Sequence, residues 1–226
     1  MAYRDLITFE RLRQANVSDA VIAQLTGKVG QAKALISQVS RLVEYHLGMT
    51  GRRTGLIVRR HTQVIERYEW TESEALGGYL TWADQKPVVE IADESADLAG
   101  VEVPRTTDRK LKRSRPKPGT VTYFGGYRRP DQVLTSSDQE TEELPTGDGE
   151  PVSGLSELPP ELPGIIETVT ENITLHVLQN RAQGNLGRRA QQSFGEQQVT
   201  IEGADPGYID RQLSRLNASP DRRLVP

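Results

Sequence analysis

Two long segments of the chain carry apolar residues at the three- and four-residue steps of an amphipathic helix. The first spans residues 17–47, and Gly27 and Gly30 leave open whether it is one helix or two. The second opens with the proline-rich stretch 158–163 and runs to residue 181. Isolated helices of this length are marginal in water, so we expect their apolar faces to pack together. The residues of this core seam are Val21, Leu25, Ile36, Val39, Val43, Leu162, Ile166, Val169, Ile173 and Val177.

Between the two segments the pattern becomes that of strands, with β-branched and aromatic residues in short, roughly alternating runs. These runs cover residues 54–70, 79–82, 88–91 and 121–124, and they predict a small, mostly antiparallel sheet. A short helix is predicted within residues 1–16, a short strand at 199–201 and a last helix at 208–216. The predicted fold class is therefore α+β, mainly α. Its core would be a bundle of two long helices and shorter ones, with an inserted β region and an extended C-terminal arm.

The same pattern predicts how the chain is divided. Two helical regions would form one core, and the segments between and after them would be an insertion, a linker and an arm. The predicted division is an N-terminal helical region (1–50), a β-rich insertion (51–130), an acidic linker (131–157), a C-terminal helical region (158–216) and the arm (217–226).

The charged residues add to this prediction, because the net charge is only −3 but basic and acidic residues are concentrated in separate segments. Residues 105–117 predict an extended basic loop, which either stays solvated or contacts a polyanion, DNA phosphate or an acidic protein surface. No aromatic residue interleaves with it, so we do not expect a base-stacking platform. The acidic linker either only connects or neutralises the basic loop of a neighbouring copy. The basic residues are Arg105, Arg109, Lys110, Lys112, Arg113, Arg115 and Lys117.

Composition and motifs argue against most kinds of catalytic and metal-binding site. The chain has no cysteine, its three histidines lie in no ligand spacing, and it has no phosphate-binding loop or nucleophile motif. Neither a signal peptide nor an apolar run long enough to span a membrane is apparent. We therefore expect a non-enzymatic protein made in the cytoplasm, with no metal, no cofactor and no membrane contact.

Four motifs, taken in order, resemble the head–tail adaptor (head completion, connector) proteins of long-tailed bacteriophages. The first helical pair ends in Tyr-His-Leu-Gly at 45–48, and a strand region contains Lys-Pro-Val-Val-Glu-Ile at 86–91. An aromatic strand end, Tyr-Phe-Gly-Gly-Tyr, follows at 123–127, and Leu-Pro-Pro-Glu-Leu at 158–162 opens the long helix. The resemblance covers most of the chain, although the basic loop and the acidic linker are longer than the family pattern.

The resemblance implies a structural virion protein at the capsid vertex, assembled in the host cytoplasm. It implies a homo-oligomeric ring, typically twelve-fold, between the portal protein and a stopper or tail-terminator ring, with double-stranded DNA passing through the lumen without sequence-specific contact. The basic loop would face either that DNA or a partner ring, and protein contact is favoured because the DNA must slide. Portal contact is implied for Tyr208, Leu213, Leu216, Arg222, Arg223 and Leu224.

Two alternatives stay open. The first is a sequence-independent DNA-binding protein that uses the basic loop 105–117. The second is another component of the phage neck, a stopper or tail-completion protein.

Overall fold

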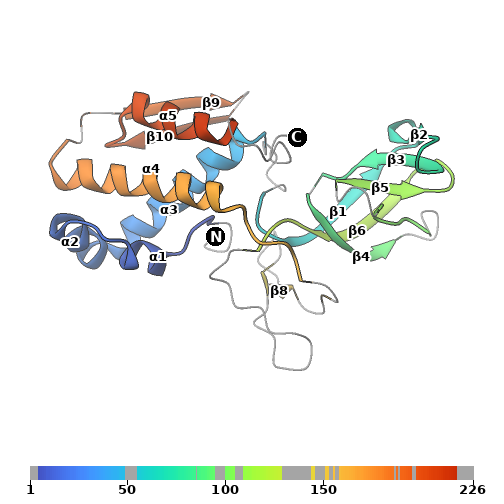
Figure 1. Cartoon of the computed structure of the whole chain (residues 1–226), viewed down its shortest axis with the longest axis horizontal. Coiled ribbons are helices and arrows are strands. Elements are labelled where there is room, and N and C mark those ends of the chain that lie inside the picture. Colours follow the sequence, from blue (N-terminus) through green and yellow to red (C-terminus); the bar gives the residue numbers. More distant parts are fainter. Residues whose placement is uncertain are drawn as a thin grey trace. The chain divides into compact units, whose positions relative to one another are not determined.

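A computed structural model describes most of the chain as two compact units (Figure 1). Unit 1 consists of Met1–Gly51 and Leu162–Pro226, and unit 2 is Arg52–Glu161. Unit 2 is therefore inserted, in sequence, between the two halves of unit 1. The residues described are 5–48, 55–84, 86–94, 100–104, 109–128, 144–145, 151–152, 155, 158–185, 187, 189–194 and 197–217.

Unit 1 contains the helices. The predicted first helix is divided at Lys28, whose backbone (φ −136°, ψ 48°) leaves the helical region directly after Gly27. Glycine weakens a helix, which fits a break at this point. The helices are α1 (Phe9–Gln14), α2 (Asp19–Gly27), α3 (Val29–His46), α4 (Gly164–Ala182) and α5 (Pro206–Asn217).

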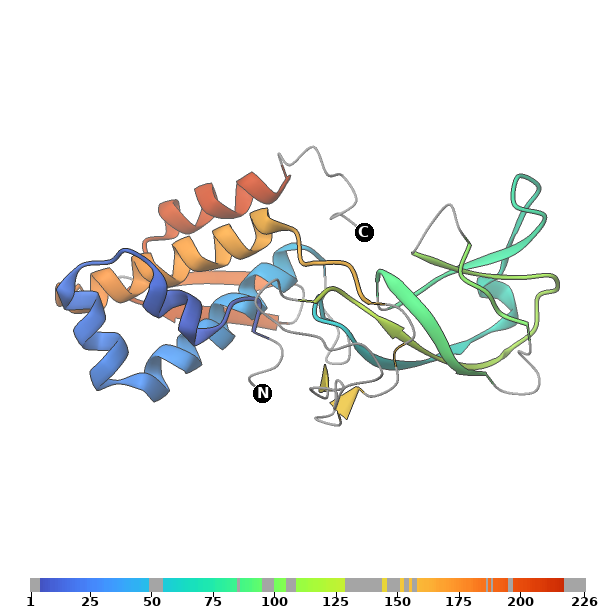
Figure 2. The ribbon, with the colours of Figure 1, turned by 60° about the horizontal axis from the view of Figure 1, so that its bottom comes forward.

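The core of unit 1 lies where α4 packs against α2, α3 and α5. Figure 2 shows α4 and α5 lying side by side. All ten residues of the core seam are at most 3% exposed, and the apolar face of α5, with Ile209, Leu213 and Leu216, is buried as well. Helices from both ends of the chain thus share one apolar core.

The long C-terminal helix begins later than the proline-rich stretch suggested. It starts at Gly164, with Pro163 as its N-cap, while residues before it run extended and Glu161 forms a bridge with Arg128. Proline fixes φ and disfavours helical backbone in the residue before it, which keeps this stretch out of the helix.

Unit 1 also contains an antiparallel hairpin of β9 (Arg189–Phe194) and β10 (Gln197–Glu202), which contacts α3 and α5. Only residues 199–201 of this hairpin were predicted as strand. The cross-strand pair Ala190 and Ile201 is 2% and 1% exposed, so this buried pair anchors the hairpin.

Unit 2 is built from two three-stranded antiparallel sheets. One has the order β1–β6–β4 and the other β2–β3–β5, and the short strands β7 (Leu144–Pro145) and β8 (Pro151–Val152) pair separately. Their core includes Ile65, Trp70, Leu111, Val121 and Tyr123. The elements are β1 (Arg59–Ile65), η2 (Arg67–Glu69), β2 (Thr71–Ser73), β3 (Gly78–Trp82), β4 (Val88–Glu94), β5 (Lys110–Arg113) and β6 (Gly119–Gly125).

The predicted fold class is wrong. The protein is a mixed α/β structure, not a helical bundle with a small β insertion, because the described residues form five α-helices and, besides β7 and β8, eight strands in three sheets. Besides the short strands β2, β7 and β8, two longer strands escaped prediction, β5 in the basic run and β9 in the glutamine-rich segment. Strands β5 and β9 are mainly polar in composition, and their pairing partners, not their own patterns, make them strands. In the portion of the chain that the structure describes, no helix combines the length and apolar character needed to cross a membrane.

Candidate interaction surface

Part of the predicted basic loop, Lys110–Arg113, is strand β5, so the prediction of an extended loop is wrong there. Lys110, Lys112 and Arg113 belong to β5, while Arg115 and Lys117 are exposed beyond its end. Strand β5 forms because Leu111, fully buried, pairs with Thr81 of β3 and anchors the segment in the core. Period-two alternation then turns Lys110 and Lys112 to the outer face. Arg105 lies outside the described residues.

Sheet pairing also brings an aromatic residue to the basic strand, which the sequence pattern did not predict. Trp82 of β3 pairs directly with Lys110 and is 55% exposed. The Nζ atoms of Lys110 and Lys86 lie 4.4 and 5.1 Å from the centroid of its ring system. Both distances fall within the range of a cation–π interaction. The only signal in the sequence was a tryptophan next to a turn that contains Lys86.

A buried glutamine fixes the backbone on which Trp82 sits. Gln63 of β1 is 4% exposed, and its Nε2 donates to the carbonyl oxygen of Trp82 at 2.9 Å. Its Oε1 accepts from the backbone N–H of Asp84 at 3.1 Å and from the hydroxyl of Tyr123 at 3.0 Å. A buried amide that satisfies three partners holds its neighbours in one arrangement. Trp82 is therefore presented by a rigid region of the sheet.

Two further contacts secure the same segment. Nε2 of His61 lies 3.4 Å from Oδ2 of Asp84, and the His61 ring packs edge-on against Tyr123. The backbone N–H of Ala83 donates to the carbonyl oxygen of Arg109 at 3.0 Å. The second bond ties the start of the basic run to the end of β3.

Positive charge accumulates around the exposed ring. Partial burial lowers the pKa of Lys86, the nearby charge of Arg109 lowers it further, and Asp84 offsets only some of this effect. Lys112, one residue beyond Leu111, differs from Lys86 and Lys110 because it forms an ion pair, with its Nζ 2.8 Å from Oε1 of Glu102. The cations over the Trp82 ring are thus Lys86 and Lys110, and Arg109 lies close enough to Lys86 to lower its pKa.

An open depression of about 290 Å³ adjoins the ring, and Trp82 and Lys110 contribute to its lining. Glu69, Glu72, Thr71 and Ser73 line it as well, so carboxylates and hydroxyls face the cationic side. We call the cation cluster, the indole and this depression together the Trp82 surface. It can accept an anionic group beside the indole but presents negative charge a short distance away.

Two of the residues predicted to contact the portal, Leu213 and Leu216, lie in the core of unit 1. Leu213 and Leu216 are each 1% exposed in the core of unit 1, so neither is available to a partner in this state. Both are buried because they share the apolar face of α5 with Ile209. Tyr208 stacks on His176 with the ring centroids 3.9 Å apart. Arg222, Arg223 and Leu224 lie outside the described residues.

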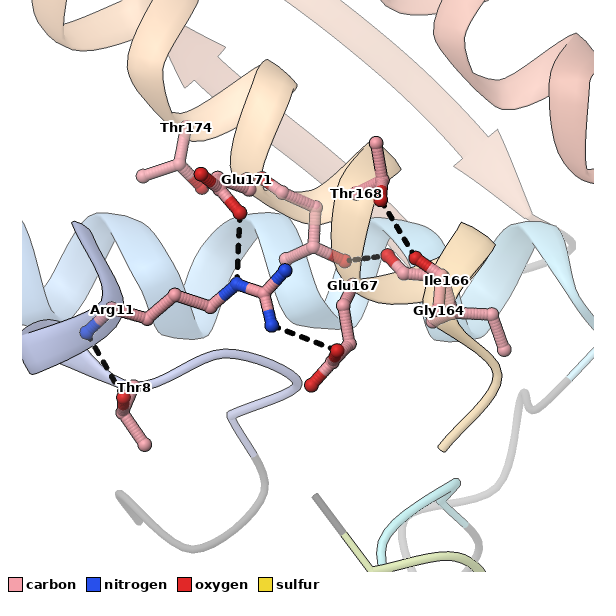
Figure 3. Close-up of polar contacts among 9 residues, drawn as sticks. Thr8, Arg11, Gly164, Ile166, Glu167, Thr168, Glu171 and Thr174 are labelled. Carbon is pink, nitrogen blue, oxygen red and sulfur yellow. Dashed lines mark hydrogen bonds and ion pairs between the residues drawn. The ribbon is translucent and has the colours of Figure 1, made fainter. Parts of the chain in front are cut away.

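A second polar cluster holds α1 against α4 (Figure 3). The guanidinium of Arg11 bonds to Glu167 and Glu171, each at 2.8 Å, and Thr8 caps α1 through the backbone N–H of Arg11. Burial would lower the pKa of Arg11, but the hydrogen bond to Glu171 and the charges of both carboxylates raise it overall. The cluster joins two helices far apart in sequence, which marks it as structural.

Among the described residues, no group of three or more His, Asp or Glu side chains is placed to hold a metal ion. The Trp82 surface is the strongest candidate for a functional site, on the geometry of its own residues. The chain matches no family model, no curated protein and no solved structure.

Proposed function

We propose that the protein is a structural component of the neck of a tailed phage. It would be a head–tail adaptor that forms a ring between the portal and the stopper or tail ring, with duplex DNA passing through the lumen. In this role the chain acts by holding neighbours in place.

One observation carries this proposal. Helices α2 and α3 from the N-terminal region and α4 and α5 from the C-terminal region share one core, while a β unit is inserted between them in sequence. This order, a helical pair, an inserted strand region, a proline-opened helix and a last short helix, is the order on which the resemblance to head–tail adaptors rests. An arrangement in which the two helical regions packed separately would have removed that support.

A ring role is also consistent with how the chain distributes its polar groups. Unit 1 closes its apolar seam internally, so its contacts with other copies would be made by polar side chains on the outer faces of its helices. Closed rings repeat one such contact around an axis, and many weak contacts then add to a stable assembly.

The test is a measurement of mass in solution. The purified chain is mixed with the portal protein encoded beside it, and mass photometry records the species formed. We expect portal rings to gain mass in multiples of one chain, up to about the number of portal subunits. A chain that stays unassociated at high concentration of both proteins contradicts the proposal.

A second candidate, sequence-independent DNA binding, is favoured by Lys86 and Lys110 over the Trp82 ring and by Arg109 near Lys86. It predicts a gel shift with any duplex that weakens steeply as salt rises, because released counterions drive such binding. Replacing Lys86, Arg109 and Lys110 with serine should abolish the shift. The absence of a shift at low salt removes this candidate.

A further inference from the structure

The Trp82 surface gathers like charges that repel one another. Two ammonium groups lie within 5.1 Å of one ring centroid, and Arg109 is close enough to lower the pKa of Lys86. Like charges held this close are stabilised by an anionic group placed between or above them. The arrangement is thus suited to a ligand that carries negative charge.

The indole between these cations is suited to a protein partner. Trp82 is 55% exposed and is fixed through its backbone by Gln63, so little conformational entropy is lost when it is covered. Tryptophan and arginine are among the residues most enriched in those that dominate binding energy at protein interfaces. The neighbouring depression gives a side chain of the partner a place beside the ring.

The carboxylates decide which kind of anion fits. Glu69 and Glu72 line the depression that also includes Lys110, and Asp84 lies near Lys86. Duplex DNA carries a charge about every 1.7 Å along its axis, so its phosphates would meet these carboxylates as well as the cations. A protein segment can place carboxylates only at the cations and leave uncharged atoms in the depression.

We infer that the Trp82 surface docks an acidic segment of another protein chain. Its carboxylates bind Lys86, Arg109 and Lys110, and its apolar atoms cover the indole of Trp82. This inference deepens the proposed function by giving the chemistry of one partner, and it depends on that function only for where the partner would be found.

The test uses the full chain and a fluorescein-labelled peptide of alternating glutamate and leucine, with binding followed by fluorescence anisotropy. A peptide with glutamine in place of glutamate serves as the uncharged control. We expect saturable binding of the acidic peptide only. Tryptophan emission should respond as well, because Trp82 is exposed whereas Trp70, the only other tryptophan, is 6% exposed.

Variants then locate the site. The double variant Lys86→Gln/Lys110→Gln should weaken peptide binding by about ten-fold, and Trp82→Ala by a similar factor. The matched control, Lys112→Gln/Lys117→Gln, removes the same charge from side chains that do not contact Trp82, and it should change binding by less than about two-fold. Unchanged thermal unfolding in all variants shows that the fold is intact.

Three results would overturn the inference. The wild-type chain could fail to bind the acidic peptide, or the two double variants could weaken binding equally, which is the mark of general charge attraction. A short DNA duplex could instead bind more tightly than the peptide in the same buffer and lose that binding in Lys86→Gln/Lys110→Gln. Because no portal protein is present, failure here is distinct from failure of the adaptor proposal.

Discussion

Gln63 illustrates how single buried side chains determine the shape of the candidate surface. Its amide links β1 to the backbone on both sides of Ala83, so the exposed Trp82 depends on a residue that no partner would touch. The sequence shows Gln63 only as a polar residue within an alternating run. Its importance comes from where β3 lies, which local pattern does not encode.

Gln63→Leu should destabilise unit 2 by about 2–3 kcal/mol, because the buried hydroxyl of Tyr123 and the partly buried carbonyl of Trp82 and N–H of Asp84 each lose a partner. Urea unfolding followed by tryptophan fluorescence measures this change. Thr62→Ala is the matched control on the same strand. Its hydroxyl bonds to Thr122 on the exposed face, so the expected loss is below about 0.5 kcal/mol. Equal losses in the two variants would contradict the role given to Gln63.

Position 126 requires glycine, both because of its backbone conformation and because of the atoms around it. Its φ is +117°, and a Cβ there would lie 2.7 Å from the Cα of Val58. Gly126→Ala should therefore prevent unit 2 from folding stably. Gly77→Ala is the matched control, since φ is +63° but nothing lies within 4 Å, so only about 1 kcal/mol should be lost. Similar melting temperatures for the two variants would show that the close contact can relax.

At the scale of elements, the apolar pattern predicted those helices and strands that pack into a core through their own apolar side chains. The stripes of α3 and α4 are continuous, and the runs that became β1, β3, β4 and β6 are rich in β-branched or aromatic residues. Strand β5 has one apolar residue, Leu111, in a run of lysine and arginine, and it becomes a strand because β3 supplies its hydrogen-bond partner. Most of the Trp82 surface could not be predicted from the sequence for the same reason, because the pairing of β3 with β5 brings its residues together.

The contact between α1 and α4 gives a prediction about elements. Arg11→Met should destabilise unit 1 by about 2 kcal/mol, because Glu167 is nearly buried and loses a charged partner, while 31% exposure of the arginine moderates the effect. Thermal unfolding followed by far-UV circular dichroism measures it. Arg13→Met removes an exposed pair with Glu10 from the same helix and should cost less than about 0.5 kcal/mol. A loss as large in Arg13→Met would argue against the Arg11 bridge.

At the scale of the whole molecule, the chain contains two separate cores, and both tryptophans belong to unit 2. Tryptophan emission therefore reports on unit 2, whereas the helical signal in circular dichroism comes mainly from unit 1. The sequence indicated the boundary through the change from helical to strand period. It did not indicate that the inserted region has a core of its own, because that depends on Leu111 of one sheet and Val121 of the other joining one apolar cluster.

Ile166→Asp should abolish the helical signal, because an unpaired buried charge costs several kcal/mol, and it should leave tryptophan emission unchanged. Val121→Asp should instead shift tryptophan emission to the red and leave the helical signal unchanged. Both residues are fully buried in the wild-type chain. A red shift of tryptophan emission in Ile166→Asp would show that the two cores do not fold independently.

Removal of residues 218–226 tests the arm implied by the resemblance. The truncated chain keeps all of α5, so its thermal unfolding should match that of the full chain, while attachment to portal rings is lost. Co-sedimentation with portal measures attachment. Truncated chain that sediments with portal as the full chain does would show that attachment lies elsewhere.

The insertion of unit 2 has a consequence for synthesis of the chain on the ribosome. Helices α2 and α3 emerge first, but α4, which covers their apolar side chains, is translated only after Arg52–Glu161 is complete. Unit 2 is continuous in sequence and can fold as it emerges, whereas the helical core can form only after the C-terminal helices have been translated. Nascent chains that stall after unit 2 should therefore recruit chaperones through the uncovered face of α3, even though their tryptophans already report a folded environment.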